Sequence, residues 1–171
     1  MRNVLLILLS AAALLNAQQQ PRRAPGWALP DSKMKIYDLA DYRGKIVILE
    51  FMQTNCGHCA AAADVLHEVE AQYGSKIQII SVVNSANEKD YTVASYVTGH
   101  KVDYPILFDA GQMMFSYTLN PHIDFPHLYV IDGAGNIRFD YTYDVTTRDI
   151  FEGKGLSAAI DRVLGNKGGK K

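Results

Sequence analysis

The sequence predicts an α/β domain with a central mixed sheet flanked by helices. Residues 46–52 and 76–83 are rich in apolar, β-branched residues, as expected for strands buried on both faces of a sheet. Segments with helical spacing of apolar residues follow these runs, and this strand–helix–strand order favours parallel strands. Two further strand-like segments, 127–132 and 136–143, are separated by Gly133-Ala134-Gly135. That separation is typical of a hairpin, which adds an antiparallel edge to the sheet.

The N-terminal half begins with residues 21–30, which contain three prolines and have neither helical nor strand periodicity. We therefore expect an extended entry segment there. Residues 35–39 alternate well enough for a short edge strand, and residues 41–44 form a turn. After the first buried strand, residues 53–55 form a loop and a helix runs from Cys56 to about residue 73.

The C-terminal half holds four more elements besides the hairpin. They are a helix over about 87–98, a short strand over 105–109, a short helix over 112–117 and an amphipathic helix over 156–164. We expect Asn87 to cap the first of these helices at its N-terminus, and Gly99 to end it.

The first 17 residues have the pattern of a secretory signal. Arg2 supplies a positive charge, and residues 4–15 form an apolar run that gives way to polar residues after Ala17. The run is too short for a membrane span, which needs about 20 apolar residues. We expect cleavage after Ala17, and an uncleaved anchor is the alternative.

The remaining chain has the length of one domain. We expect an extended segment over 18–30, a compact domain over 31–165 and a disordered basic tail over 166–171. Loss of residues 1–17 changes the formal net charge from −1 to −2, with 16 cations against 18 acids. A near-neutral chain argues against nucleic acid as the main partner, because such binding depends on clustered Lys and Arg.

Cys56 and Cys59 are the two cysteines of the chain. A disulfide between them closes so short a loop that it stabilises the fold weakly. Their position after a buried strand and at a helix start is instead typical of redox chemistry, because a helix N-terminus stabilises a thiolate. We expect Cys56 to be the exposed attacking thiolate and Cys59, one turn further and more buried, to resolve the mixed disulfide.

Two other uses of the pair are a structural bridge and a metal site. Two thiolates leave a tetrahedral zinc sphere incomplete, and neither His58 nor His67 is placed to close it. We therefore predict no metal. Ala60 follows the second cysteine, so the sequence is not a haem-attachment motif, and we predict no cofactor.

Residues 46–59, IVILEFMQTNCGHC, resemble the strand–loop–helix core of thioredoxins and protein disulfide isomerases. The wider stretch from APGWALP through LADYRGKIVILEFM to FPHLYVIDGAGNI is similar to the TlpA/ResA-type extracytoplasmic thioredoxin-like proteins. This resemblance covers residues 24–165. It implies a thioredoxin fold with an N-terminal extension and a central strand-and-helix insertion at about 85–120.

The resemblance also assigns roles to site residues. Glu50 matches the buried acid that accepts a proton from the resolving thiol, and burial would make it a usable base. The alternative is a glutamate that meets solvent at the sheet edge. Pro126 matches the cis-proline that faces the cysteine pair, with an ordinary trans-proline as the alternative. Gly57 and His58 match the dipeptide of the disulfide-isomerase motif, where the histidine stabilises the attacking thiolate.

Four positions near this site depart from the family pattern or remain open. Asn55 replaces the usual aromatic residue before the first cysteine, and Phe125 replaces a small or β-branched residue before Pro126. Both changes are expected to alter the surroundings of the pair. His122 and His127 flank Pro126, and we expect solvated or core roles for them rather than roles in the site.

The pattern predicts a thiol–disulfide oxidoreductase that acts outside the cytoplasm, in the periplasm or extracellularly, on exported proteins with thiols or disulfides. The family resemblance favours a reductase supplied with electrons by a membrane donor. The Cys-Gly-His-Cys sequence supports the alternative of an oxidase or isomerase. A thiol peroxidase is a third alternative, although Thr54 does not match the threonine spacing of peroxidatic sites.

Overall fold

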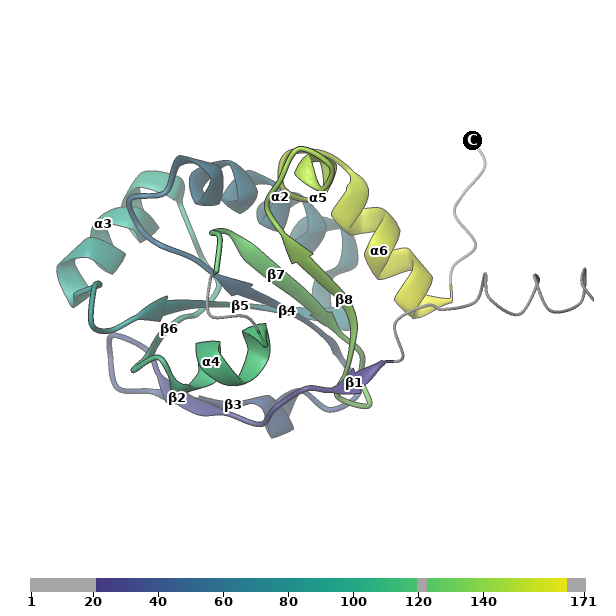
Figure 1. Ribbon diagram of the computed structural model, residues 1–171, viewed down its shortest axis with the longest axis horizontal. Helices are drawn as coiled ribbons and strands as arrows, with labels where there is room; N and C mark the ends of the chain where they lie inside the picture. The colour runs from purple at the N-terminus through teal and green to yellow at the C-terminus, as the bar shows by residue number, and fades with distance from the viewer. Residues whose placement is uncertain (1–20, 120–122, 166–171) are drawn as a thin grey trace, which may run out of the picture.

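A computed structural model describes residues 21–119 and 123–165 of the chain (Figure 1). The predicted signal over 1–17 with its cleavage site, the predicted basic tail over 166–171, and His122 lie outside the described residues. The described helices include none that combines the length and apolar character needed to cross a membrane.

A six-stranded sheet forms the centre of the domain, in the order β1-β8-β7-β4-β5-β6. Its parallel half consists of β4 (Ile46–Phe51), β5 (Ile77–Asn84) and β6 (Ile106–Asp109). Its antiparallel half consists of β7 (His127–Ile131), β8 (Asn136–Thr142) and β1 (Arg22–Arg23). The predicted mixed sheet is therefore confirmed, with β4 at the junction of the two halves.

Helices cover one face of this sheet (Figure 1). They are α2 (Gly57–Tyr73), α3 (Asp90–His100), α5 (Arg148–Glu152) and α6 (Gly155–Leu164), with the short 3₁₀ turn η2 (Gly74–Lys76) after α2. The other face is covered by α4 (Gln112–Thr118), by η1 (Leu39–Tyr42), and by a separate two-stranded sheet of β2 (Ala28–Pro30) and β3 (Ile36–Asp38). This arrangement is the thioredoxin fold predicted from the sequence, with α3, β6 and α4 in the region of the expected insertion.

Strand alternation divides the core into two clusters, one on each face of the sheet. Ile46 and Ile48 of β4 pack in the cluster beneath α2, whereas Val47, Leu49 and Phe51 pack in the cluster on the opposite face. Because side chains alternate along a strand, Glu50, two positions after Ile48 in β4, also points toward α2.

The predicted ends of the helix over 87–98 were wrong, and some short elements were not predicted. The expected extended segment 21–30 contains the strands β1 and β2, which are too short to show a periodicity. Asn87 does not cap α3, which begins at Asp90 after an N-cap at Lys89 and passes through Gly99. Lys101, in the left-handed conformation, ends this helix instead. A short helix, α5, was not predicted.

Candidate active site

The cysteine pair lies at the first turn of α2, at the carboxyl end of β4. Cys56 is the N-cap residue, and its Sγ accepts a hydrogen bond from the backbone N–H of Cys59 at 3.2 Å. A sulfur in this position faces the unpaired N–H groups of the first helical turn and the positive end of the helix dipole. Cys56 is partly exposed, whereas Cys59 is fully buried. This difference in access is the one expected between an attacking and a resolving cysteine.

The loop before β7 faces the pair. The Phe125–Pro126 peptide bond is cis, as predicted. The Sγ of Cys56 lies 3.7 Å from the carbonyl oxygen of Phe125, so this loop closes one side of the site. Pro126 is buried, and Phe125 packs against both core clusters. Phe125 thus contacts the cysteine pair through its backbone carbonyl while its side chain packs against the core on both faces of the sheet.

Glu50 is completely buried in β4, so the alternative of a solvent-facing glutamate is excluded. One carboxyl oxygen accepts a 2.5 Å hydrogen bond from the hydroxyl of Ser81 on β5, and the other has no partner among the described residues. Burial raises the pKa of Glu50 to about 7, and the Ser81 hydrogen bond offsets part of this rise. A carboxyl group with this pKa can accept or donate a proton near neutral pH.

Two tyrosines lie on the α2 side of the sheet near this carboxyl. The hydroxyl of Tyr96 on α3 donates a 2.9 Å hydrogen bond to the backbone carbonyl of Cys59. Tyr104 is buried, and its hydroxyl has no partner within the described ranges. Burial and then the charge of Glu50 raise the pKa of both tyrosines. Both therefore stay protonated near neutral pH and can serve as hydrogen-bond donors.

His58 is held by residues from the C-terminal part of the chain. Its ring stacks on Tyr143, with 4.0 Å between ring centroids, and its Nδ1 lies 3.5 Å from a carboxyl oxygen of Glu152 on α5. That carboxylate also accepts 2.6 Å hydrogen bonds from the hydroxyl of Tyr143 and the Nε of Arg148. The hydrogen bond that Cys56 Sγ accepts comes from the backbone rather than from this imidazole.

The loop that precedes the pair is fastened by another acid that the sequence did not reveal. Glu88 is almost fully buried and accepts 2.8 Å hydrogen bonds from both the backbone N–H and the hydroxyl of Thr54. It also accepts one from Thr92 on α3 at 2.6 Å. Asn55 is exposed beside a hollow of about 290 Å³ on this side of the pair. The insertion thus anchors the loop before Cys56.

His127 lies in the core, as expected. Its Nε2 is 2.7 Å from a carboxyl oxygen of Asp140, and its Nδ1 is 3.0 Å from the hydroxyl of Thr142. These contacts join β7 to β8. They account for both ring nitrogens of His127 without a role at the cysteine pair.

The fold and the position of the cysteine pair define the class of the thioredoxin-like thiol–disulfide oxidoreductases. The chain belongs to the AhpC/TSA family, whose model matches residues 21–140.

Two curated relatives carry related names. The chain is 23% identical over 133 residues to the thioredoxin-like protein YneN of Bacillus subtilis (strain 168), covering 77% of this chain and 76% of the relative. It is 29% identical over 118 residues to the thiol-disulfide oxidoreductase ResA of Bacillus anthracis, covering 68% of this chain. That alignment spans 65% of the length of ResA, just under two thirds.

Solved structures share the fold. A candidate thiol:disulfide interchange protein DsbE from Chlorobium tepidum superposes with a TM-score of 0.72 at 23% identity, covering 86% of this chain and 99% of that one. A secreted disulfide oxidoreductase of Mycobacterium tuberculosis, homologous to DsbE of E. coli, gives a TM-score of 0.64 at 17% identity. The superposition covers 80% of this chain and 95% of the Mycobacterium tuberculosis chain.

Proposed function

We propose that the protein reduces disulfides of exported proteins through Cys56 and Cys59. The observation that carries the proposal is a partly exposed cysteine at the N-cap of α2, one turn from a buried cysteine. A buried carboxyl with a pKa of about 7 lies on the same side of the sheet. These are the nucleophile, the resolving thiol and the base that disulfide reduction needs.

The reaction proceeds in two exchanges. The Cys56 thiolate attacks a substrate disulfide, forms a mixed disulfide and releases one substrate thiolate. Glu50 then takes the proton of Cys59, whose sulfur attacks Cys56 and releases the second substrate thiolate. The substrate gains two electrons, and the Cys56–Cys59 pair is left as a disulfide. A membrane electron donor would return two electrons to the pair for the next cycle.

The surroundings of His58 support a reductase over the oxidase or isomerase alternative. A cation or a donor on Cys56 would stabilise the thiolate and therefore make the pair more oxidising. His58 instead lies 3.5 Å from Glu152 and stacks on Tyr143. The negative charge of Glu152 would offset the positive charge of an imidazolium in the electrostatic field at Cys56. The Cys-Gly-His-Cys sequence itself remains the observation in favour of the alternative. The thiol peroxidase alternative gains no support, because the hydroxyl of Thr54 is bonded to Glu88.

The signal-like pattern of residues 1–17 supports action outside the cytoplasm. The solved relative from Mycobacterium tuberculosis is itself named as a secreted protein. Exported proteins with accessible disulfides are therefore the proposed substrates.

Turnover of a model substrate tests the proposal. The protein should catalyse the reduction of insulin disulfides by dithiothreitol, Cys56→Ser should abolish catalysis, and Cys59→Ser should stall as a mixed disulfide. Glu68→Gln, which removes an exposed carboxyl from the same helix, is the matched control and should leave turnover unchanged. Faster oxidation of a reduced peptide than reduction of insulin would favour the oxidase alternative.

A further inference from the structure

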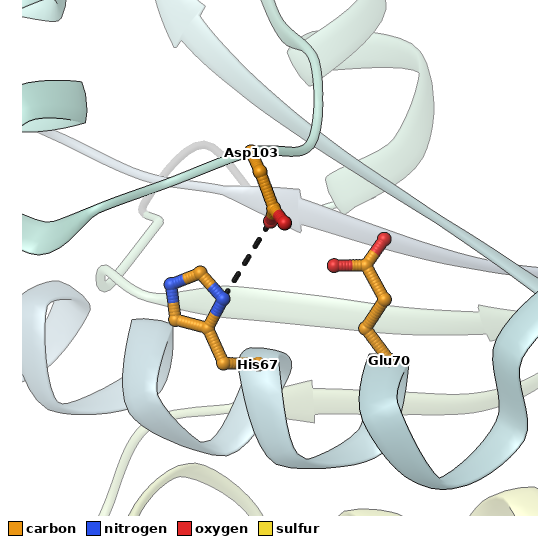
Figure 2. Close-up of side chains that lie close together, drawn as sticks. All are labelled: His67, Glu70 and Asp103. Atoms are coloured by element: carbon orange, nitrogen blue, oxygen red, sulfur yellow. Dashed lines mark ion pairs between the residues drawn. The ribbon is translucent and has the colours of Figure 1, made fainter.

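Three side chains with metal-binding groups meet on the surface beside the C-terminal half of α2, away from the cysteine pair at its first turn (Figure 2). His67 and Glu70 are three residues apart on this helix and therefore share one face. Asp103 comes from the loop between α3 and β6 and points toward both of them. One ligand atom from each residue lies within 4.8 Å of the others.

The histidine is oriented as a metal ligand would be. Its Nε2 lies 3.2 Å from the backbone carbonyl oxygen of His100, a partner that can accept a hydrogen bond but cannot donate one. When Nε2 donates its hydrogen to this carbonyl, Nδ1 is the nitrogen that can bind a metal, and it faces Asp103 at 3.6 Å from the carboxyl oxygen. Histidines that bind metals almost always donate their other ring N–H to a carbonyl or a carboxylate in this way.

The three groups bring two carboxylates and one imidazole to the same point of the surface, with Asp103 exposed and 3.6 Å from the ring of His67. A divalent cation between them would balance the charge of both carboxylates.

We propose that His67, Glu70 and Asp103 bind one divalent transition-metal ion of the zinc type. One imidazole nitrogen and two carboxyl oxygens are ligands that Zn²⁺ accepts at about 2.0–2.2 Å. Small side-chain movements bring the three groups to these distances, and solvent supplies the remaining position.

The ion would link two parts of the domain that are distant in sequence. It would join α2, the helix that carries the cysteine pair, to the loop after α3, the first helix of the insertion. Tyr104, the neighbour of Asp103, lies near Glu50. The site would thus fasten the insertion against the helix of the active site. It does not depend on the proposed reaction.

Calorimetric titration of the full chain with ZnCl₂ tests the proposal. Cys56→Ser/Cys59→Ser is the background, because free thiolates would themselves bind zinc. We expect one ion per chain. His67→Gln and Asp103→Asn should each weaken binding by at least about 10-fold, since even indirect partners of a metal contribute about 10- to 100-fold.

Two controls change a histidine and a carboxylate elsewhere on α2. His58→Gln and Glu68→Gln should keep the zinc affinity of the background chain. Zinc at 100 times its Kd should also lower the unfolding equilibrium constant by about 100-fold. This effect should disappear in His67→Gln. Absence of saturable binding, or equal affinity with and without His67, would overturn the proposal.

Discussion

Replacement of Glu50 by glutamine should stabilise the protein, and by an amount that depends on pH. The folded state raises the pKa of this fully buried carboxyl from 4.5 to about 7. At about 1.4 kcal/mol per pKa unit, the shift corresponds to a destabilisation of about 3 kcal/mol once the group is charged.

The sign follows from proton binding. Between pH 4.5 and 7 the folded protein holds a proton that the unfolded chain has lost, so the free energy of unfolding falls as pH rises through this window. The glutamine amide of the variant cannot ionise, so the variant does not suffer this loss. The stability of Glu50→Gln relative to the natural protein should therefore rise by about 3 kcal/mol from pH 4.5 to pH 8.

Urea denaturation at pH 4.5, 6, 7 and 8, with the cysteine pair kept oxidised, measures this difference. The glutamine amide puts an NH₂ donor in place of one carboxyl oxygen, and one oxygen of Glu50 has no partner within the described residues. This change shifts the stability difference between variant and natural protein by the same amount at every pH. The pH dependence therefore carries the test. Glu68→Gln is the control for loss of an exposed carboxyl and should show little change with pH. A flat difference for Glu50→Gln, or one that grows toward low pH, would contradict a raised pKa of Glu50 in the folded protein.

Three further predictions concern the neighbours of the buried carboxyl and the pair. Iodoacetamide at pH 7 should alkylate Cys56 well before Cys59, as mass spectrometry of tryptic peptides would show; the reverse order would exchange their roles. Ser81→Ala removes the hydrogen bond that lowers the carboxyl pKa, so the stability loss should move to higher pH, and an unchanged midpoint would contradict this. Glu152→Gln should release His58 and raise the reduction potential of the Cys56–Cys59 pair by roughly 15–30 mV. The same substitution in a His58→Gln background should leave the potential unchanged. Equal shifts in the presence and absence of His58 would show that Glu152 acts without His58.

The sequence predicted those parts of the site that depend on local pattern. The position of Cys56 and Cys59 followed from a buried strand that runs directly into a helix. Glu50 lies two positions from Ile48, and strand alternation is enough to place both on the face beneath α2. Pro126 was identified by resemblance to a family, and its cis bond is present.

The parts that the sequence did not predict depend on contacts between distant segments. Glu152 lies 94 positions after His58, in a five-residue helix without apolar periodicity. Glu88 reads as an ordinary surface acid, yet its hydrogen bonds with Thr54 and Thr92 bury it. Asn87 does not cap α3 because the backbone N–H groups of Asn87 and Glu88 donate back to the carbonyl of Asn84, so the chain is still in a turn there. Only the tertiary structure brings these groups to the active site.

The equilibrium reduction potential of the Cys56–Cys59 pair, measured in a redox buffer, tests the proposed direction of electron flow most directly. We expect a value near that of thioredoxin, about −270 mV, because the negative charge of Glu152 offsets the positive charge that His58 could place beside Cys56. A value between about −180 mV, typical of disulfide isomerases, and about −120 mV, typical of strong oxidants, would contradict the reductase assignment.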